Sequence, residues 1–223
     1  MKQKSLCKKK VLITAGPTFE PIDPVRFIGN FSSGHMGFSL AYEAALRGAE
    51  VTLISGPSSL KIGHPSVNQI KVNTADEMYN ACIKSAPEAE IIIMAAAVAD
   101  FTVKHTSTSK IKKDNNTLVV EFVRTKDILK ALGKNKKKNQ VLVGFALETE
   151  NELMNASMKL QKKNLDIIVL NSLNDKGAGF GTLTNKVTII NRNGKVINGM
   201  LKDKTEVASD IFDSVLLSID PTV

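Results

Sequence analysis

The sequence predicts an α/β fold: a Rossmann-like, doubly wound and mostly parallel sheet, with a flap excursion and a C-terminal hairpin plus helix. Two observations carry this prediction. Short apolar runs such as residues 11–15 and 90–97 do not alternate with polar residues, which indicates strands buried on both faces. Helical patterns repeatedly separate such runs, and strand–helix alternation favours parallel strands with helices on both faces.

Local signals bound the expected elements. Thr74 with Glu77, and Thr149 with Glu152, form capping-box patterns that open helices. Glycines stop two others, and Asn193-Gly194 is a strong hairpin signal. In chain order we expect strand 11–15, helix 36–46 before Gly48, strands 51–55 and 67–72, helix 74–85, strands 90–97 and 118–123, helix 126–132 before Gly133, strand 141–146, helix 149–163, strand 166–170, strands 186–192 and 195–199, and helix 205–217.

The chain shows no shift in composition along its 223 residues. We therefore expect a single domain over residues 9–219, preceded by a polar tail, residues 1–8. Residues 100–116 are polar, bear lysines and lack helical periodicity. This segment is predicted to leave the domain as a flexible flap.

Charge and cysteine content narrow the class of protein. The net charge of +8 is compatible with nucleic acid, an anionic membrane or phosphorylated substrates. The basic run 134–138 has no aromatic residue for base stacking, so we interpret it as a solvated loop. No apolar stretch is long enough for a membrane span or a signal peptide. Cys7 and Cys82 are expected to be unpaired thiols. We expect a cytoplasmic protein that binds neither nucleic acid nor membrane.

The first long loop is the main candidate for a binding site. Ligands of open α/β sheets sit beyond the carboxyl ends of the strands. Residues 16–35 connect a strand to a helix there, whereas such connections usually take about two to six residues. Backbone N–H groups and hydroxyls at Ser32, Ser33 and Gly34, next to the start of a helix, favour anion binding.

Other strand ends add small residues and charges. Ala95, Ala96 and Ala97 leave room for a ligand, and Asp100 supplies a carboxylate at the rim. Lysines on the flap and on one predicted helix could neutralise a triphosphate: those of residues 110–113, Lys159 and Lys163. The loop lacks the dinucleotide motif G-x-G-x-x-G, which disfavours an NADPH-dependent reductase. The P-loop pattern is also absent from the chain. These residues alone indicate an anion- or nucleotide-binding domain, so a non-catalytic module also stays open.

An ordered set of segments nevertheless resembles phosphopantothenoylcysteine synthetase, the synthetase domain of the bacterial bifunctional phosphopantothenoylcysteine decarboxylase/synthetase. The resemblance runs from about Lys9 to Ile219. The matching segments are residues 11–18, 22–28, Asn30, 32–34, 36–37, 95–100, 110–113, 143–146, 148–149 and 163–166.

This resemblance implies a ligase of coenzyme A biosynthesis. In it, the carboxylate of 4′-phosphopantothenate attacks the α-phosphate of CTP, with Mg²⁺ assisting, and an acyl-cytidylate forms as pyrophosphate leaves. The amine of L-cysteine then displaces CMP to give 4′-phosphopantothenoyl-L-cysteine. ATP is the less expected nucleotide. The resemblance also implies a homodimer, and a flavin-dependent decarboxylase fused to the chain or acting as its partner.

The resemblance further assigns roles to residues. Lys110 on the flap and Asn30 are the expected catalytic residues, for activation and for ligation respectively. His35 and Lys126 depart from the lysine and proline that are usual in the family. The expected nucleotide-binding residues are Ala95, Ala96, Ala97, Asp100, Lys110, Phe145, Lys159 and Lys163. The expected substrate-binding residues are Arg26, Asn30, Ser32, Ser33, Gly34 and Ala97. No metal ligand is assigned.

Overall fold

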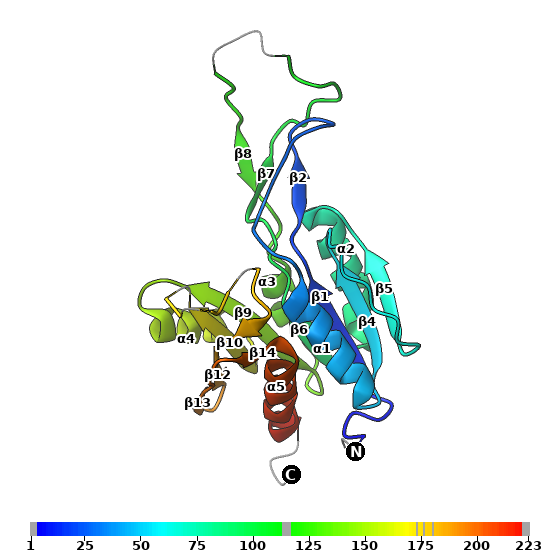
Figure 1. The fold of residues 1–223 in the computed structure, drawn as a ribbon, viewed down its shortest axis with the longest axis vertical. Coiled ribbons are helices and arrows are strands. Elements are labelled where there is room, and N and C mark those ends of the chain that lie inside the picture. Colours follow the sequence, from blue (N-terminus) through cyan, green and yellow to red (C-terminus); the bar gives the residue numbers. More distant parts are fainter. Residues whose placement is uncertain (1–3, 113–116, 173, 176, 180, 220–223) are drawn as a thin grey trace.

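A computed structural model describes residues 4–112, 117–172, 174–175, 177–179 and 181–219. Within these residues, eight strands form one sheet in the order β13-β12-β10-β9-β6-β1-β4-β5 (Figure 1). All neighbours from β10 to β5 are parallel, whereas β12 and β13 are antiparallel additions at one edge. The predicted doubly wound, mostly parallel sheet is confirmed. Its strands are β1 (Lys10–Ala15), β4 (Glu50–Ser55), β5 (Val67–Lys71), β6 (Ile91–Met94), β9 (Val141–Glu148), β10 (Ile167–Ser172), β12 (Val187–Asn191) and β13 (Val196–Asn198).

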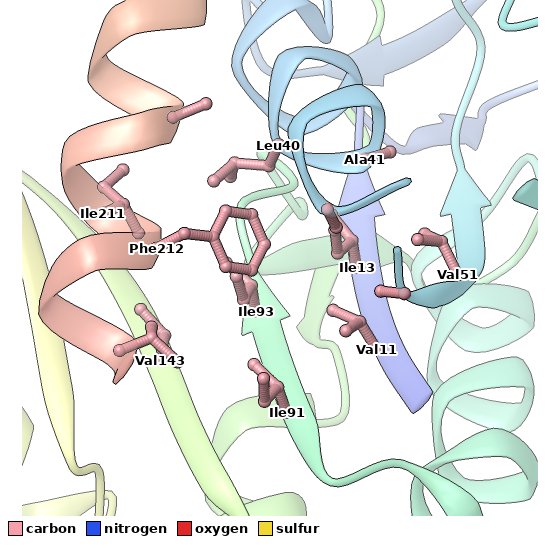
Figure 2. Close-up of a cluster of buried hydrophobic side chains, with 14 of the residues drawn as sticks. Val11, Ile13, Leu40, Ala41, Val51, Ile91, Ile93, Val143, Ile211 and Phe212 are labelled. Carbon is pink, nitrogen blue, oxygen red and sulfur yellow. The ribbon is translucent and has the colours of Figure 1, made fainter. Parts of the chain in front are cut away.

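Helices cover both faces of the sheet because side chains alternate along each buried strand. On β1, Val11 and Ile13 belong to the core under α1 and α5, and Leu12 belongs to the core on the other face. Figure 2 shows the ring of Phe212 between α5 and the strands, beside Leu40 of α1. Burying such a ring stabilises the fold by roughly 1.5–3 kcal/mol. The helices are α1 (His35–Leu46), α2 (Ala75–Ser85), the 3-10 turn η1 (Ala86–Glu88), α3 (Ile128–Asn135), α4 (Glu152–Lys162) and α5 (Lys204–Ile219).

The start of the described chain packs on the domain. Leu6 lies in the segment that was predicted as a polar tail. It is fully buried, and its N–H donates to the carbonyl of Arg47 at 3.0 Å. Arg47 in turn bonds to Glu43 of α1 and to Ser209 and Asp213 of α5. This network ties α1 to α5 below the core.

An arm of short strands projects from the sheet (Figure 1). It consists of two antiparallel pairs, β2 (Phe19–Pro21) with β3 (Phe27–Gly29) and β7 (Phe101–Val103) with β8 (Phe122–Arg124). The flap excursion predicted at 100–116 lies on this arm, although its residues 113–116 lie outside the described residues. The strand predicted at 118–123 is shifted to β8. No strand was predicted at β2 or β3, because three residues show no periodicity.

Two predicted helix boundaries are wrong. Gly133 lies inside α3 instead of ending it, and a Cβ there would stand 1.9 Å from the carbonyl oxygen of Lys163. Close approach of two backbones, not a helix stop, therefore requires this glycine. The capping box at Thr149 does not form either. Asn151, in the left-handed conformation with φ 47°, precedes α4, and its side chain caps nothing.

Three other local predictions are confirmed. The hydroxyl of Thr74 accepts the N–H of Glu77 at 3.2 Å, as a capping box requires. Gly194, with φ 85°, turns the hairpin between β12 and β13. Helix α5 forms where helix 205–217 was predicted, and it buries Val207, Ile211 and Val215. The small pair β11 (Thr184–Asn185) and β14 (Lys202–Asp203) precedes this helix.

The two thiols are free and differ in exposure. Cys7 is exposed, whereas Cys82, on the inner face of α2, is buried. Burial raises the pKa of Cys82 to about 12, so this thiol is unreactive at neutral pH. In the described part of the chain, we find no helix with the length and apolarity that crossing a membrane would need.

Candidate active site

A cavity of about 310 Å³ lies at the carboxyl ends of the central strands. Strands β1 and β6 are neighbours at the centre of the sheet. After β1 the chain continues to β4 on one side of this pair, and after β6 it continues to β9 on the opposite side. The loops that follow β1 and β6 therefore diverge, which is where open α/β sheets bind ligands. The cavity is lined by Asn30, residues 32–37, residues 95–98, Asp100, residues 145–147, Lys159, Asn171, Gly179, Asn185 and Lys204.

One wall of the cavity is the start of α1. Gly34, with φ 84°, is the N-cap, and no side chain caps this helix. A Cβ on Gly37 would stand 2.5 Å from the Cβ of Ala15, so the glycine lets α1 pack directly on β1. The hydroxyl of Ser58 donates to the carbonyl of Ser33 at 2.8 Å and holds the approach to the helix. This wall offers backbone N–H groups and the positive end of a helix to an anion.

The facing wall is the segment after β6. The alanines predicted as its strand end lie beyond β6, which ends at Met94, and Ala97 keeps an isolated parallel bridge to Pro17. Two threonines that sequence reasoning missed fix the segment: Thr14 accepts the N–H of Ala96 at 3.1 Å, and Thr18 accepts the N–H of Ala99 at 3.0 Å. Small side chains on a hydrogen-bonded backbone leave a preformed space for a flat or bulky ligand group.

Asn30 joins the two walls. Its Nδ2 donates to the carbonyl of Val98 at 3.0 Å and makes a longer contact of 3.5 Å with that of Ala97. The side chain is thus oriented before any ligand binds. An oriented amide can donate to negative charge that develops in a reaction.

A second cavity, of about 540 Å³, adjoins the first. Five residues border both cavities: Ala96, Val98, Asp100, Phe145 and Lys159. Lys163 borders only the second one. Most of the predicted nucleotide-binding residues are therefore brought together around one continuous hollow.

Two of the lysines of this hollow, Lys159 and Lys163, have different surroundings. Nζ of Lys159 donates to the carbonyl of Phe145 at 2.8 Å. Burial lowers the pKa of Lys159, although the charges of Glu148 and Asp100 oppose this effect. Lys163 forms an ion pair with Asp127. Burial raises the pKa of the Asp127 carboxyl, but the hydrogen bonds from Lys163 and from the N–H of Lys130, together with the charges of both lysines, outweigh burial, so the pKa is lowered overall.

Two predicted site residues, Lys110 and Arg26, lie on the arm and border neither cavity. Arg26 is ion-paired with the inaccessible carboxylate of Asp23 and donates to the carbonyl of Ile111 at 3.0 Å. Asp23 also accepts the N–H of Ile111 at 3.2 Å. The hydrogen bonds to Arg26 lower the pKa of Asp23 well below its usual range. Arg26 therefore anchors the segment that carries the exposed Lys110, and no cavity places it against a substrate.

Three further residues of the first cavity were not predicted: Asn171, Asn185 and Lys204. Nδ2 of Asn185 donates to Oδ1 of Asn171 at 3.3 Å, and Lys204 is the first residue of α5. They come from β10, β11 and α5, so only the packed C-terminal segment brings them here. The described residues hold no group of three or more His, Cys, Asp or Glu side chains suited to a metal ion.

Comparison with known proteins places the chain in a family. Residues 6–218 match the family described as DNA/pantothenate metabolism flavoprotein C-terminal domain. The chain is 54% identical over 214 residues to a cysteine/cysteine sulfinic acid decarboxylase of an unknown prokaryotic organism, covering 96% of this chain and 60% of that protein. It is 47% identical over 210 residues to the coenzyme A biosynthesis bifunctional protein CoaBC of Borreliella burgdorferi, covering 93% of this chain and 52% of that protein.

A solved structure agrees with this placement. The crystal structure of the C-terminal domain of a coenzyme A biosynthesis bifunctional protein CoaBC superposes with a TM-score of 0.84 at 40% identity. The match covers 98% of this chain and 100% of that one. By contrast, the chain spans little more than half the length of the two relatives above. The chain thus belongs to the family of DNA/pantothenate metabolism flavoprotein C-terminal domains.

Proposed function

We propose that this chain is a ligase of coenzyme A biosynthesis that joins 4′-phosphopantothenate to L-cysteine through an acyl-cytidylate formed with CTP. The similarity to CoaBC proteins, and to the C-terminal domain of one of them, supports the pathway. The observation that carries the proposal is the convergence of Asn30, the start of α1, the alanine segment and Lys159 on one preformed hollow. Those groups fit an acid, a nucleotide and a developing negative charge.

The first step needs position and positive charge more than covalent help. A carboxylate oxygen of 4′-phosphopantothenate attacks the α-phosphorus of CTP, and the bond to pyrophosphate breaks. Lys159 and Lys163 border the hollow in which the nucleotide would lie. Lys110 would reach the triphosphate by movement of the arm, as a closing element that completes the site.

The second step forms the amide bond. The amine nitrogen of cysteine attacks the acyl carbon, CMP leaves, and the nitrogen loses a proton. Asn30 suits the oxyanion of this step, because its amide donates hydrogen bonds without adding a net charge. Its contact with the carbonyl of Val98 fixes the direction of that donor.

Mg²⁺ fits this site as a companion of the nucleotide. Mg²⁺ is commonly held by one or two carboxylates together with substrate phosphates. Asp100 is the carboxylate that borders both cavities, and no larger cluster of ligands exists among the described residues. When bound, the ion would neutralise charge on the phosphates.

An assay of pyrophosphate release tests the proposal directly. The chain is incubated with CTP and 4′-phosphopantothenate, first without and then with L-cysteine. We expect pyrophosphate only when both substrates are present, and product only after cysteine is added. Absence of pyrophosphate would refute the ligase, whereas an equal rate with ATP would refute CTP specificity. NADPH binding, or steep salt-dependent binding to DNA, would favour the reductase or the non-catalytic module.

One relative is named a decarboxylase, which suggests a second activity to assay. No thiol of the described residues is placed to support decarboxylation in the hollow, since neither Cys7 nor Cys82 borders either cavity. Moreover, only 60% of that relative's length is matched. We therefore assign decarboxylation to a flavin-dependent partner or fused domain. Release of CO₂ by this chain alone from cysteine, cysteine sulfinic acid or 4′-phosphopantothenoylcysteine would contradict that assignment.

The arm supports the proposal of a homodimer. Large apolar side chains on it face solvent: Phe31 is 87% and Val119 is 90% exposed, and Val25 and Phe27 are more than half exposed. Apolar groups gathered on a projecting element usually mark an interface. The chain has a mass of 24.2 kDa, and sedimentation equilibrium should give twice this value. A monomer at micromolar concentration would contradict this proposal.

A further inference from the structure

Lys204 is a buried cation without a counter-charge. Only 7% of the residue is exposed, and Nζ donates to the carbonyls of Gly179 at 3.2 Å and Thr182 at 2.6 Å. No carboxylate lies within ion-pair distance of it among the described residues. Lys136 shows the usual alternative, because its similarly buried ammonium contacts both carboxylate oxygens of Asp166.

This position is unfavourable for stability. Burial lowers the pKa of Lys204, which records the cost of keeping its ammonium away from water. Lys204 is also the first residue of α5, where the positive end of the helix repels a cation. A buried charge that stability does not favour is usually kept for function.

The loop between β10 and β11 holds the ammonium in the first cavity. The carbonyls of Gly179 and Thr182 take two of its donors, and an ammonium has three. Lys204 and Gly179 both line the cavity. The remaining N–H can therefore serve a ligand there, because no described acceptor takes it.

The cavity around this ammonium suits an anion. The start of α1, with Ser32 and Ser33, forms the same cavity, as do the amides of Asn171 and Asn185. Asp100 is the one carboxylate among its described lining residues, and it stands where the first cavity meets the second. Lys204 borders the first cavity alone.

We propose that Lys204 binds a phosphate group of a substrate in the first cavity, together with the start of α1. The bound phosphate supplies the counter-charge that the described residues do not provide. The identity of the ligand rests on the proposed function: the group is either the phosphomonoester of 4′-phosphopantothenate or the triphosphate of CTP. The binding of phosphate itself does not depend on the ligase chemistry.

Calorimetric titrations of variants test this inference. Inorganic pyrophosphate, CTP and 4′-phosphopantothenate are each titrated into the wild type, Lys204→Met, Lys204→Arg and Lys202→Met. The last is the control: Lys202 lies two residues away, pairs with Asp210 and borders neither cavity. We expect Lys204→Met to weaken at least one ligand by about tenfold or more, Lys204→Arg to restore part of the affinity, and Lys202→Met to change it by less than about twofold.

The pattern of losses identifies the source of the phosphate. Weakened CTP and pyrophosphate binding would assign Lys204 to the triphosphate, and weakened 4′-phosphopantothenate binding would assign it to the phosphomonoester. Equal affinities of wild type and Lys204→Met for all three ligands would overturn the inference, as would a wild type that binds none of them.

A measurement on the wild type covers the case in which Lys204→Met does not fold. The side-chain methylene signals of Lys204 are followed by NMR through a pH titration, with and without pyrophosphate. A bound anion favours the charged form, so pyrophosphate should raise the pKa of Lys204. An unchanged pKa in the presence of bound pyrophosphate would overturn the inference.

The two proposals can fail separately. If the wild type makes product while Lys204→Met binds every phosphate ligand as tightly, only the role of Lys204 is wrong. If Lys204 governs phosphate binding but the chain releases no pyrophosphate from CTP, only the ligase is wrong.

Discussion

The hollow and the arm differ in how firmly the structure holds their functional groups. Around the hollow, threonine hydroxyls fix the alanine segment and Asn30 is bonded to the carbonyl of Val98. On the arm, strands of three residues carry exposed side chains, and Lys110 is exposed. Preorganised donors suit the stabilisation of a transition state, whereas a projecting element suits closure over a bound substrate.

A short set of contacts links the two regions. The loop after β1 runs through the arm and returns to the hollow at Asn30. On the way, Asp23 and Arg26 hold Ile111, next to Lys110. We infer that activation and ligation depend on different regions, so variants in each should fail at different steps.

The largest effect is expected from Lys110→Gln on the arm. Removing the charge that closes on the triphosphate should slow pyrophosphate release by about a thousandfold, in the range of losing a key transition-state donor. The exposed position predicts little change in the free energy of unfolding. Lys104→Gln, on the same arm and paired with Glu121, is the matched control and should retain activity. Equal turnover by Lys110→Gln and the wild type would mean that the charge of Lys110 on the arm has no role in catalysis.

Asn30→Asp should separate the two steps. A carboxylate there would repel the oxyanion of ligation and lose the donor to Val98, so the cysteine step should slow by about a hundredfold. Acyl-cytidylate formation should slow less. Single-turnover quenching resolves the two rates, and Asn80→Asp on α2 is the control. Equal slowing of both steps would mean that Asn30 only shapes the hollow.

The parts of the fold that the sequence predicts are those with a local signal. Long apolar runs predict β1, β4, β6, β9 and β10, and topology then places the site at their carboxyl ends. The arm strands have no such signal. Gly133 shows the limit of local reasoning, because its close contact with Lys163 arises only when α3 packs on the end of α4.

The candidate site follows the same division. Ser32 and Ala97 lie on segments that the sequence places beyond the carboxyl ends of strands, the resemblance adds Asn30 and Phe145, and all four border the first cavity. Asn185 precedes the hairpin and Lys204 follows it, and nothing in their sequence surroundings distinguishes them. Arg26 is the converse case: it stands in a motif of the resemblance, yet the structure places it against Asp23.

A smaller effect, on stability, should come from Gly37→Ala in the wall of the hollow. The added Cβ would meet the Cβ of Ala15 at 2.5 Å and the carbonyl of Thr14 at 2.8 Å, so α1 would have to move away from β1. Urea denaturation should show a loss of about 1–3 kcal/mol in the free energy of unfolding. Gly63→Ala, where nothing lies within 4 Å, should be neutral. A neutral Gly37→Ala would mean that this wall is less firmly packed than the structure indicates.

The smallest effect should be a pH dependence that arises in the hollow. Burial lowers the pKa of Lys159, the charge of Lys163 lowers it too, and Glu148, Asp100 and Asp127 oppose them. As pH rises toward 10.5, Lys159 in the folded protein therefore loses its proton before a lysine of the unfolded chain does.

Affinity and stability should consequently move in opposite directions over that pH range. Loss of the charge should weaken CTP binding by about threefold to tenfold. The unfolded chain then holds more protons than the folded one, so the contribution of Lys159 to the free energy of unfolding rises with pH. Lys204 has a lowered pKa as well, so both quantities are measured in the Lys204→Arg background. Adding Lys159→Arg keeps the charge at all these pH values and should flatten the affinity profile. A profile that stays equally steep would place the titrating group outside the hollow, and the contrast with the arm would lose its electrostatic basis.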